Sequence, residues 1–216
     1  MRYIVLLIIA LLAAFNTHSQ DKNAEKLLKT LAEKHNGYDN ITADFTFFYK
    51  NLQTESENKW NGSIIMKGEK YKLELRNSTI YYNGKTLWNH LHGPNEVNIS
   101  EPVKNEDSDI INHPHQIFDI YKKDFKYKYL GKETSKGEEV YLVDLYPEEL
   151  DKDYSRIRLN LTRDNIRIHS AKIFAKDCSR YRINIKNMKT NQPVDDSAFV
   201  FNEEDHPDVE VIDMRF

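Results

Sequence analysis

Residues 41–50 read Ile-Thr-Ala-Asp-Phe-Thr-Phe-Phe-Tyr-Lys, and an apolar side chain stands at every second position from Ile41 to Tyr49. A period of two places these side chains on one face of a β-strand and their neighbours on the other. Thr, Phe and Tyr also favour strands. The stretch therefore predicts a long β-strand with one buried face, and the rest of the chain is interpreted outward from it.

The same alternation returns along most of the sequence. Turn sequences such as Asn83-Gly84 separate most of the alternating segments. Many short strands at regular spacing are typical of a large antiparallel sheet that is curled or nearly closed. We expect a mainly antiparallel β fold with covering helices, arranged as an incomplete, open β-barrel of about eleven strands. Beyond residues 41–50, strands are expected at residues 60–67, 71–76, 79–82, 86–90, 96–99, 125–130, 140–146, 156–162, 166–175, 180–186 and 199–201.

Two helices are expected to cover the apolar face of this sheet. Residues 22–35 carry apolar side chains at the three- and four-residue spacing of one helical stripe, and the Asn-Gly pair at 36–37 ends the helix. Residues 115–123 show helical spacing again, and Pro114 suits a helix start. This second helix, inserted between two sets of strands, is interpreted as a lid. Its apolar residues are Ile117, Phe118, Ile120 and Tyr121.

The N-terminus has the pattern of a cleaved secretory signal peptide. Arg2 supplies a positive charge, residues 3–15 are almost continuously apolar, and residues 16–20 are polar. The apolar run is shorter than a membrane-spanning helix requires. We place the cleavage after Ser19, so that residues 1–19 are removed and residues 20–216 form one exported domain.

The composition excludes several classes of protein. Lys and Arg number 31 against 34 Asp and Glu, for a formal net charge of −3, so the chain lacks the basic excess of a dedicated nucleic-acid binder. The single cysteine, Cys178, excludes an intrachain disulfide and a cysteine-based zinc site. No nucleotide-binding or nucleophile motif such as Gly-x-Ser-x-Gly occurs. We therefore expect neither an enzyme nor a bound cofactor.

Histidines form the one constellation that favours metal chemistry. His90 and His92 make one i, i+2 pair, and His113 and His115 make another. However, His92 lies in a turn sequence and Pro114 separates the second pair, so solvated loop histidines are the preferred interpretation and no metal site is assigned. A His-based exported metalloprotein remains the less favoured alternative.

The apolar face of the sheet allows two outcomes. If the helices fit it tightly, the result is an ordinary packed core. If they fit loosely, the result is an aromatic-lined cavity that holds apolar ligands. Periodicity alone does not separate these outcomes.

The order of motifs resembles the periplasmic outer-membrane lipoprotein carrier family (LolA), in particular its divergent LolA-like branch. The resemblance covers essentially the whole mature chain. The sequence departs from the family pattern at residues 67–71, which read Lys-Gly-Glu-Lys-Tyr. Family members carry Arg-Pro-Asn-x-Phe here, and that Arg contacts the lid. Lys67 keeps the positive charge but lacks the planar group with which Arg makes two parallel hydrogen bonds. The matching pieces are the opening helix, residues 41–45 (Ile-Thr-Ala-Asp-Phe), 62–66 (Gly-Ser-Ile-Ile-Met), 83–88 (Asn-Gly-Lys-Thr-Leu-Trp), 96–99 (Glu-Val-Asn-Ile), 199–201 (Phe-Val-Phe) and 208–211 (Asp-Val-Glu-Val).

This resemblance implies a monomeric periplasmic carrier, or chaperone, rather than a catalyst. It would shield the acyl chains of lipoproteins and ferry them from an inner-membrane lipoprotein-releasing transporter to an outer-membrane acceptor. A carrier of another apolar ligand, such as a fatty acid or glycolipid, is the main alternative. Lys67 is the candidate lid latch. The lipid-binding cavity is expected on the inward face of the first strands, at Phe45, Phe47, Ile64, Met66, Tyr71, Leu73 and Trp88.

Overall fold

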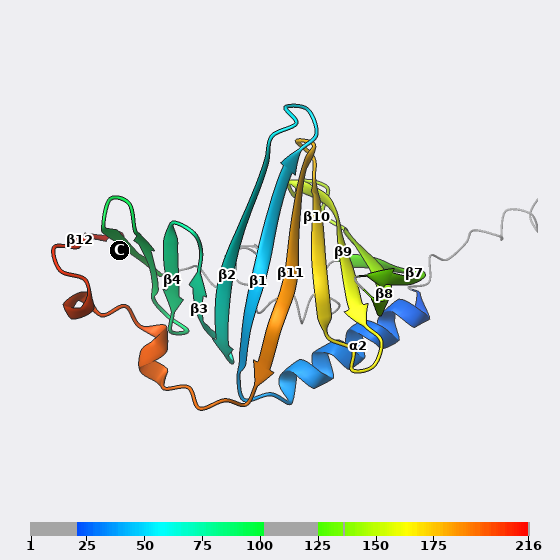
Figure 1. Ribbon diagram of the computed structural model, residues 1–216, viewed down its shortest axis with the longest axis horizontal. Coiled ribbons are helices and arrows are strands. Elements are labelled where there is room, and N and C mark those ends of the chain that lie inside the picture. Colours follow the sequence, from blue (N-terminus) through cyan, green and yellow to red (C-terminus); the bar gives the residue numbers. More distant parts are fainter. Residues whose placement is uncertain (1–20, 102–124, 136, 216) are drawn as a thin grey trace, which may run out of the picture.

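The computed structural model describes residues 21–101, 125–135 and 137–215. One α-helix, α2 (Lys22–Asn36), precedes a twelve-stranded sheet with the order β12-β6-β5-β4-β3-β2-β1-β11-β10-β9-β8-β7. Figure 1 shows this sheet as one continuous surface. The strands are β1 (Ile41–Asn51), β2 (Glu57–Lys67), β3 (Lys70–Glu74), β4 (Ser78–Tyr82), β5 (Leu87–Leu91), β6 (Glu96–Ser100), β7 (Phe125–Ser135), β8 (Glu138–Pro147), β9 (Tyr154–Thr162), β10 (Ile168–Ala175), β11 (Ser179–Thr190) and β12 (Glu210–Asp213).

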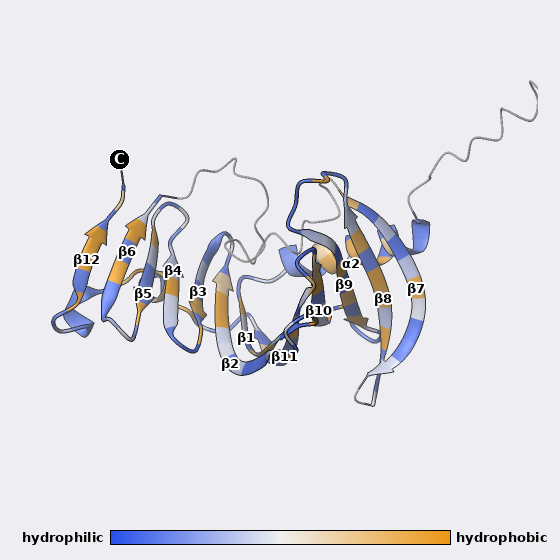
Figure 2. Cartoon of the chain, turned by 90° about the horizontal axis from the view of Figure 1, so that it is seen from above, coloured by the Kyte–Doolittle hydropathy of each residue, from blue (hydrophilic) through white to orange (hydrophobic). Residues whose placement is uncertain are grey.

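The sheet is antiparallel except at one edge, where β12 runs parallel to β6. Strand β1 lies at the centre because it pairs with β2 on one side and with β11 on the other. The two edges, β7 and β12, lie at opposite ends of the strand order, so the barrel is open. Figure 2 shows the curvature of the sheet, with α2 on its concave side. The expected open antiparallel sheet with an N-terminal helix is confirmed.

Helix α2 begins at a capping aspartate. The Asp21 carboxylate accepts hydrogen bonds from the backbone N–H groups of Asn23 and Ala24, which the first helical turn leaves without helical partners. Its other oxygen accepts from the N–H of Tyr129 at 3.0 Å. Burial acts to raise the pKa of Asp21, but these backbone hydrogen bonds outweigh it and lower the pKa. The cap therefore joins the helix start to the edge strand β7.

The main core lies between α2 and the concave face. Leu28 and Leu31 of the helix are buried against the inward side chains of the strands, and Leu159 and Leu161 of β9 are fully buried there. The expected alternation is therefore present, with one apolar and one polar face along the long strands. Among the described residues, no helix has the length and hydropathy of a membrane-spanning segment.

A second apolar layer covers the convex face near the other end of the sheet. After β11 the chain runs past the lower ends of β3 and β4 (Figure 1) through two short 3-10 helices, η3 (Asp196–Phe199) and η4 (Glu203–Asp205), before it enters β12. Phe199 is fully buried, and the ring of Phe201 lies 5.8 Å from that of Tyr81 on β4. We call residues 191–215 the C-terminal segment.

One predicted strand is wrong. Residues 199–201 are not a strand, because Phe199 ends η3 and Phe201 anchors an irregular stretch against the sheet. Two aromatic residues two positions apart fit a strand and a buried irregular segment equally well. The predicted lid helix at residues 115–123 and the signal peptide at residues 1–19 both lie outside the described residues.

Candidate functional site

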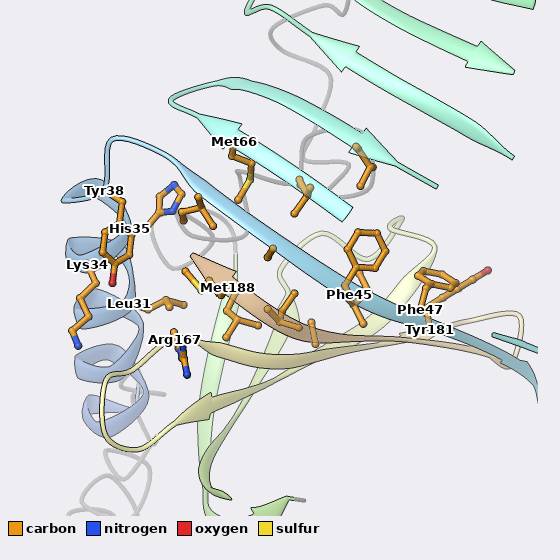
Figure 3. A pocket seen from close by; sticks show the side chains of 18 of the residues that line it. Leu31, Lys34, His35, Tyr38, Phe45, Phe47, Met66, Arg167, Tyr181 and Met188 are labelled. Carbon is orange, nitrogen blue, oxygen red and sulfur yellow. The ribbon is translucent and has the colours of Figure 1, made fainter. Parts of the chain in front are cut away.

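The cavity lies between the concave face of the central strands and the C-terminal half of α2. Its volume is about 400 Å³, and its wall is almost entirely aliphatic and aromatic (Figure 3). This is within the range of pockets that hold small ligands. Lining residues are Leu31, Lys34, His35, Tyr38, Ile41, Ala43, Phe45, Phe47, Trp60, Ile64, Met66, Leu73, Leu75, Ile166, Arg167, Ile168, Ala171, Ile173, Tyr181, Ile183, Ile185 and Met188.

Alternation along two central strands builds the middle of this wall. Phe45 on β1 stands opposite Gly62 on β2 and Ile185 on β11, so these positions share the concave face. A Cβ atom at residue 62 would lie 2.5 Å from the Phe45 ring and 2.5 Å from the carbonyl oxygen of Glu74. Glycine at this position therefore allows the Phe45 ring to lie flat across the neighbouring strand.

One end of the cavity is aromatic. The Phe47 ring stacks on Trp60 with centroids 4.3 Å apart and lies 6.0 Å from Tyr181 of β11. Tyr49 continues the row, 5.4 Å from Tyr181. Stacked aromatic rings form a rigid apolar wall with little rotamer freedom, which suits the end of a ligand channel.

The other end carries the ionisable side chains of the lining. Lys34 and His35 come from the last turn of α2, and Arg167 comes from the turn before β10 (Figure 3). The Lys34 ammonium donates a hydrogen bond to the carbonyl oxygen of Asn165 at 2.5 Å. Cations at a helix C-terminus also interact favourably with the helix dipole. The cavity is therefore apolar along its length and cationic at the α2 end.

The structure brings five of the seven predicted lining residues to this cavity. They are Phe45, Phe47, Ile64, Met66 and Leu73.

The other two lie elsewhere. Tyr71 faces the same side of the sheet but is 1% exposed, with its ring 5.4 Å from Tyr82, so it packs beside the cavity and not in its wall. Trp88 stands opposite Tyr81 and Ile99, on the convex face. Leu87 and Trp88 are both apolar, so alternation does not fix which of them faces inward, and a one-residue shift reverses the faces.

The sequence interpretation missed most of the wall. β10 and β11 contribute Ile173, Tyr181, Ile183 and Ile185, and α2 contributes Leu31. The same period of two is present at residues 166–175 and 180–186. Sequence patterns show which strands have an apolar face but not which strands are neighbours. The pairing of β11 with β1, which brings these residues to the cavity, was therefore not predicted.

The predicted lid latch holds a different segment. The Lys67 ammonium lies 2.7 Å from one carboxylate oxygen of Asp196 in η3, and the Lys70 ammonium lies 2.6 Å from the other. Lys67 also donates to the carbonyl oxygen of Val194 at 3.4 Å. These two lysines stand opposite each other at the β2–β3 turn, so Asp196 is placed between like charges. Lys67 thus anchors the C-terminal segment; the lid residues lie outside the described part of the chain.

This anchor gives a pH-dependent prediction. Hydrogen bonds from Lys67 and Lys70 lower the pKa of Asp196 from 3.8 to about 2. Because the pKa is lowered in the folded state, the stabilisation is complete above the ordinary carboxyl pKa and is lost as the pH falls towards 2. We expect Asp196→Asn to speed amide hydrogen exchange in residues 194–201 at neutral pH. In the unmodified protein, acid below about pH 4 should lower the protection of the same amides, measured relative to their intrinsic exchange rates at each pH. The matched control is Glu203→Gln, an acidic residue of the same segment; equal exchange in both variants would refute the anchor.

The histidines do not assemble a metal site within the described residues. His90 is buried, with its ring 5.3 Å from His92 and 4.4 Å from His206 of the C-terminal segment. However, His92 bonds the Thr79 hydroxyl, and no group of three or more candidate ligands is placed to hold a metal in the described part of the chain. Burial, with the neighbouring His90, lowers the pKa of His206. His113 and His115 lie outside the described residues.

The curved open sheet and the apolar cavity under α2 define an open half-barrel with an apolar pocket on its concave side. Residues 13–190 match the family described as "Outer membrane lipoprotein carrier protein LolA", and the chain belongs to this family. The match ends where β11 ends, so the C-terminal segment lies beyond it. No curated protein matches.

Solved structures match this chain at low identity. An uncharacterized conserved protein from Thermus thermophilus has the same fold, with a TM-score of 0.58 at 10% identity over 89% of this chain and 99% of that one. A LolA superfamily protein from Nitrosomonas europaea aligns with a TM-score of 0.43 at 13% identity, over 82% and 97%. LprF from Mycobacterium bovis aligns with a TM-score of 0.46 at 14% identity, over 82% and 97%.

Proposed function

We propose that this protein is a periplasmic carrier that shields the acyl chains of lipoproteins in the cavity and ferries them from the inner to the outer membrane. The observation that carries the proposal is the apolar cavity of about 400 Å³ between α2 and the central strands. Burial of acyl chain yields about 0.8 kcal/mol per CH₂ group. Apolar contacts are not directional, so one wall accepts chains of different length.

Family membership supports the same proposal, since the family is named for lipoprotein carriage. The proposed route starts with cleavage of residues 1–19 on export to the periplasm. The partners are an inner-membrane lipoprotein-releasing transporter, which loads the carrier, and an outer-membrane acceptor, which unloads it. The carrier acts as a monomer and as a chaperone, with no bond made or broken.

A carrier that must release its cargo needs a way to offset the favourable free energy of burying the acyl chains. We propose that Ile117, Phe118, Ile120 and Tyr121 occupy part of the empty cavity as a lid, so that cargo exchanges one apolar contact for another. Binding is then weaker than the cargo's burial alone would give, and release to an acceptor is easier.

We propose that the displaced lid then closes over the bound acyl chain, so a single charged substitution in it sets a carboxylate against the chain and weakens binding without unfolding the sheet. We expect Ile117→Glu and Phe118→Glu each to reduce the affinity for a fluorescent fatty-acid probe about tenfold, or ~1.4 kcal/mol. The far-ultraviolet circular dichroism of the strands should not change. Unchanged affinity in both variants would contradict a lid at this segment.

Native mass spectrometry of the mature protein, purified from the cell envelope without detergent, tests the carriage of lipoproteins directly. The expected species is a 1:1 complex with an acylated lipoprotein. If only free lipid is bound, the protein is still a carrier, but its cargo is a lipid and not a lipoprotein. A protein that carries only a metal ion would refute the proposal and favour the histidine-based alternative.

One observation favours a second candidate, carriage of a free fatty acid or glycolipid. Arg167 lies in the cavity wall at the α2 end and forms no ion pair with a carboxylate among the described residues. A guanidinium at the end of an apolar channel suits the acidic headgroup of an amphiphile. If this candidate holds, Arg167→Gln weakens binding of a fatty acid but not of its methyl ester.

A further inference from the structure

The convex face carries an unusual concentration of positive charge over β9, β10 and β11. On the concave side of these strands Leu159, Ile173 and Ile183 line the core or the cavity, so the alternating neighbours point away from it. Those neighbours are five cations, which we call the basic cluster: Arg156, Arg158, Lys172, Arg180 and Arg182.

The register of β10 with its two neighbours, β9 and β11, places like charges side by side in this cluster. Lys172 stands directly opposite Arg158 on one neighbouring strand and directly opposite Arg182 on the other. Like charges directly opposite each other destabilise a sheet. A solvated sheet face needs only polar side chains, so this row has an energetic cost that the fold does not require.

An aromatic ring and a buried carboxylate hold the cluster together. Four of its cations surround the Phe174 ring: Arg156 at 3.9 Å from the centroid, Lys172 at 4.8 Å, Arg180 at 5.2 Å and Arg158 at 6.0 Å.

The carboxylate is Asp144 of β8, 1% exposed. It accepts hydrogen bonds from Arg156 at 2.9 Å and from Arg158 at 2.7 and 2.9 Å. The two guanidinium groups are therefore fixed in place before any partner arrives.

Most of the charge is left unneutralised. Within the described part of the chain, Lys172, Arg180 and Arg182 form no ion pair with a carboxylate. Burial, together with the four neighbouring arginines, lowers the pKa of Lys172. The chain as a whole carries a net charge of −3, so this positive region stands out locally against an acidic protein.

Among the residues that the structure describes, no segment covers the convex face over β9, β10 and β11 (Figure 1). The C-terminal segment covers that face only on the other side of β1, where Phe201 packs on Tyr81 of β4. From these observations we infer that the basic cluster is a docking surface for a protein partner that presents a strip of carboxylates.

Two features favour a protein over a membrane as this partner. The cluster lies on the face of the sheet opposite the cavity, so a lipid surface bound there would face away from the cavity mouth. Arginine and aromatic side chains in one fixed group are also typical of protein interface centres, and planar guanidinium groups bind carboxylates in a bidentate manner. The inference goes beyond the proposed carriage and does not depend on what the cavity holds.

The test measures binding of a fluorescein-labelled synthetic peptide of alternating glutamate and alanine to the full mature chain by fluorescence anisotropy. The Lys172→Glu/Arg182→Glu variant removes two unpaired cations. It places the new carboxylate at residue 172 opposite Arg158, and the new carboxylate pair at 172 and 182 replaces the like-charge pair that Lys172 and Arg182 already form, so the variant should fold as well as the unmodified protein. We expect it to bind the peptide more than tenfold more weakly, a change of about 1.4 kcal/mol.

The matched control is Lys26→Glu/Lys29→Glu on the exposed face of α2, which changes the net charge by the same amount. It should retain the affinity of the unmodified protein. Equal weakening in both variants, or no binding by the unmodified protein, would overturn the docking surface. So would binding of phosphatidylglycerol vesicles through the cluster without binding of the peptide, because it would assign the cluster to a lipid surface.

Discussion

Replacement of Phe47 by glutamate is expected to weaken binding of an apolar probe about a hundredfold. The substitution puts a carboxylate on the cavity wall where the Phe47 ring now stacks on Trp60 at 4.3 Å. A ligand that fills the cavity must then desolvate that group without offering a hydrogen bond, at a cost of ~2–3 kcal/mol. The measurement is titration of the mature protein with a fluorescent fatty acid.

The neighbouring residue provides the control. Phe48 occupies the next position on the same strand, so its side chain lies on the convex face, opposite Lys59 and Arg182. Phe48→Glu introduces the same charge next to cations and away from the cavity. It should leave the probe affinity within about twofold, roughly 0.4 kcal/mol. If the two variants bind the probe equally well, the cavity is not the binding site.

The second large effect is expected at Asp144. This carboxylate is 1% exposed and accepts hydrogen bonds from Arg156, Arg158 and the Tyr146 hydroxyl. Asp144→Ala leaves its arginine partners without their counter-charge. Breaking a buried pair in this way costs ~3–5 kcal/mol, and the partly exposed arginines place the expected loss in the free energy of unfolding near ~3 kcal/mol. Urea denaturation measures it through the shift in midpoint.

An exposed pair on the same strand is the matched comparison. Glu139 on β8 forms an ion pair with Arg163, and its side chain is 40% exposed. Exposed pairs contribute little, so Glu139→Ala should change the free energy of unfolding by less than ~1 kcal/mol. Added salt should partly restore the Asp144→Ala variant, because it screens the cations that remain. If Asp144→Ala lowers the free energy of unfolding no more than Glu139→Ala does, water solvates Arg156 and Arg158 well enough without the carboxylate, and the prediction is wrong.

Strand periodicity was the most reliable part of the sequence. The alternation from Ile41 to Tyr49 predicts a strand with an inward apolar face, and β1 has that face in the structure. The opening helix was equally readable, because a stripe at helical spacing and an Asn-Gly end are both local signals. Local backbone preference and one-sided burial act together in these elements, so the pattern is unambiguous.

The sequence was less informative about which strands pair with each other and on which face of the sheet each side chain lies. Trp88 is predicted to face inward but lies on the convex face. Leu87 and Trp88 are both apolar, so the local pattern does not distinguish the two faces, and the packing of Phe201 on the convex side is not visible in it. Ile183 and Tyr181 were not placed in the cavity because nothing local in the sequence states that β11 lies beside β1. Contacts between distant parts of a chain depend on the whole fold, and these contacts complete the candidate site.

The pairing of β1 with β11 has a consequence for how the protein acquires its activity. Phe45 lies opposite Ile185, so the two walls of the cavity come from opposite ends of the chain and meet only along this seam. Closing so long a loop is slow, because its entropy is lost before the contacts form. As the chain is synthesised from its N-terminus, β1 and β2 exist for a long time without their partner strand. The cavity is therefore absent from every shortened chain that stops before residue 179, and ligand binding is among the last properties that the folding protein gains.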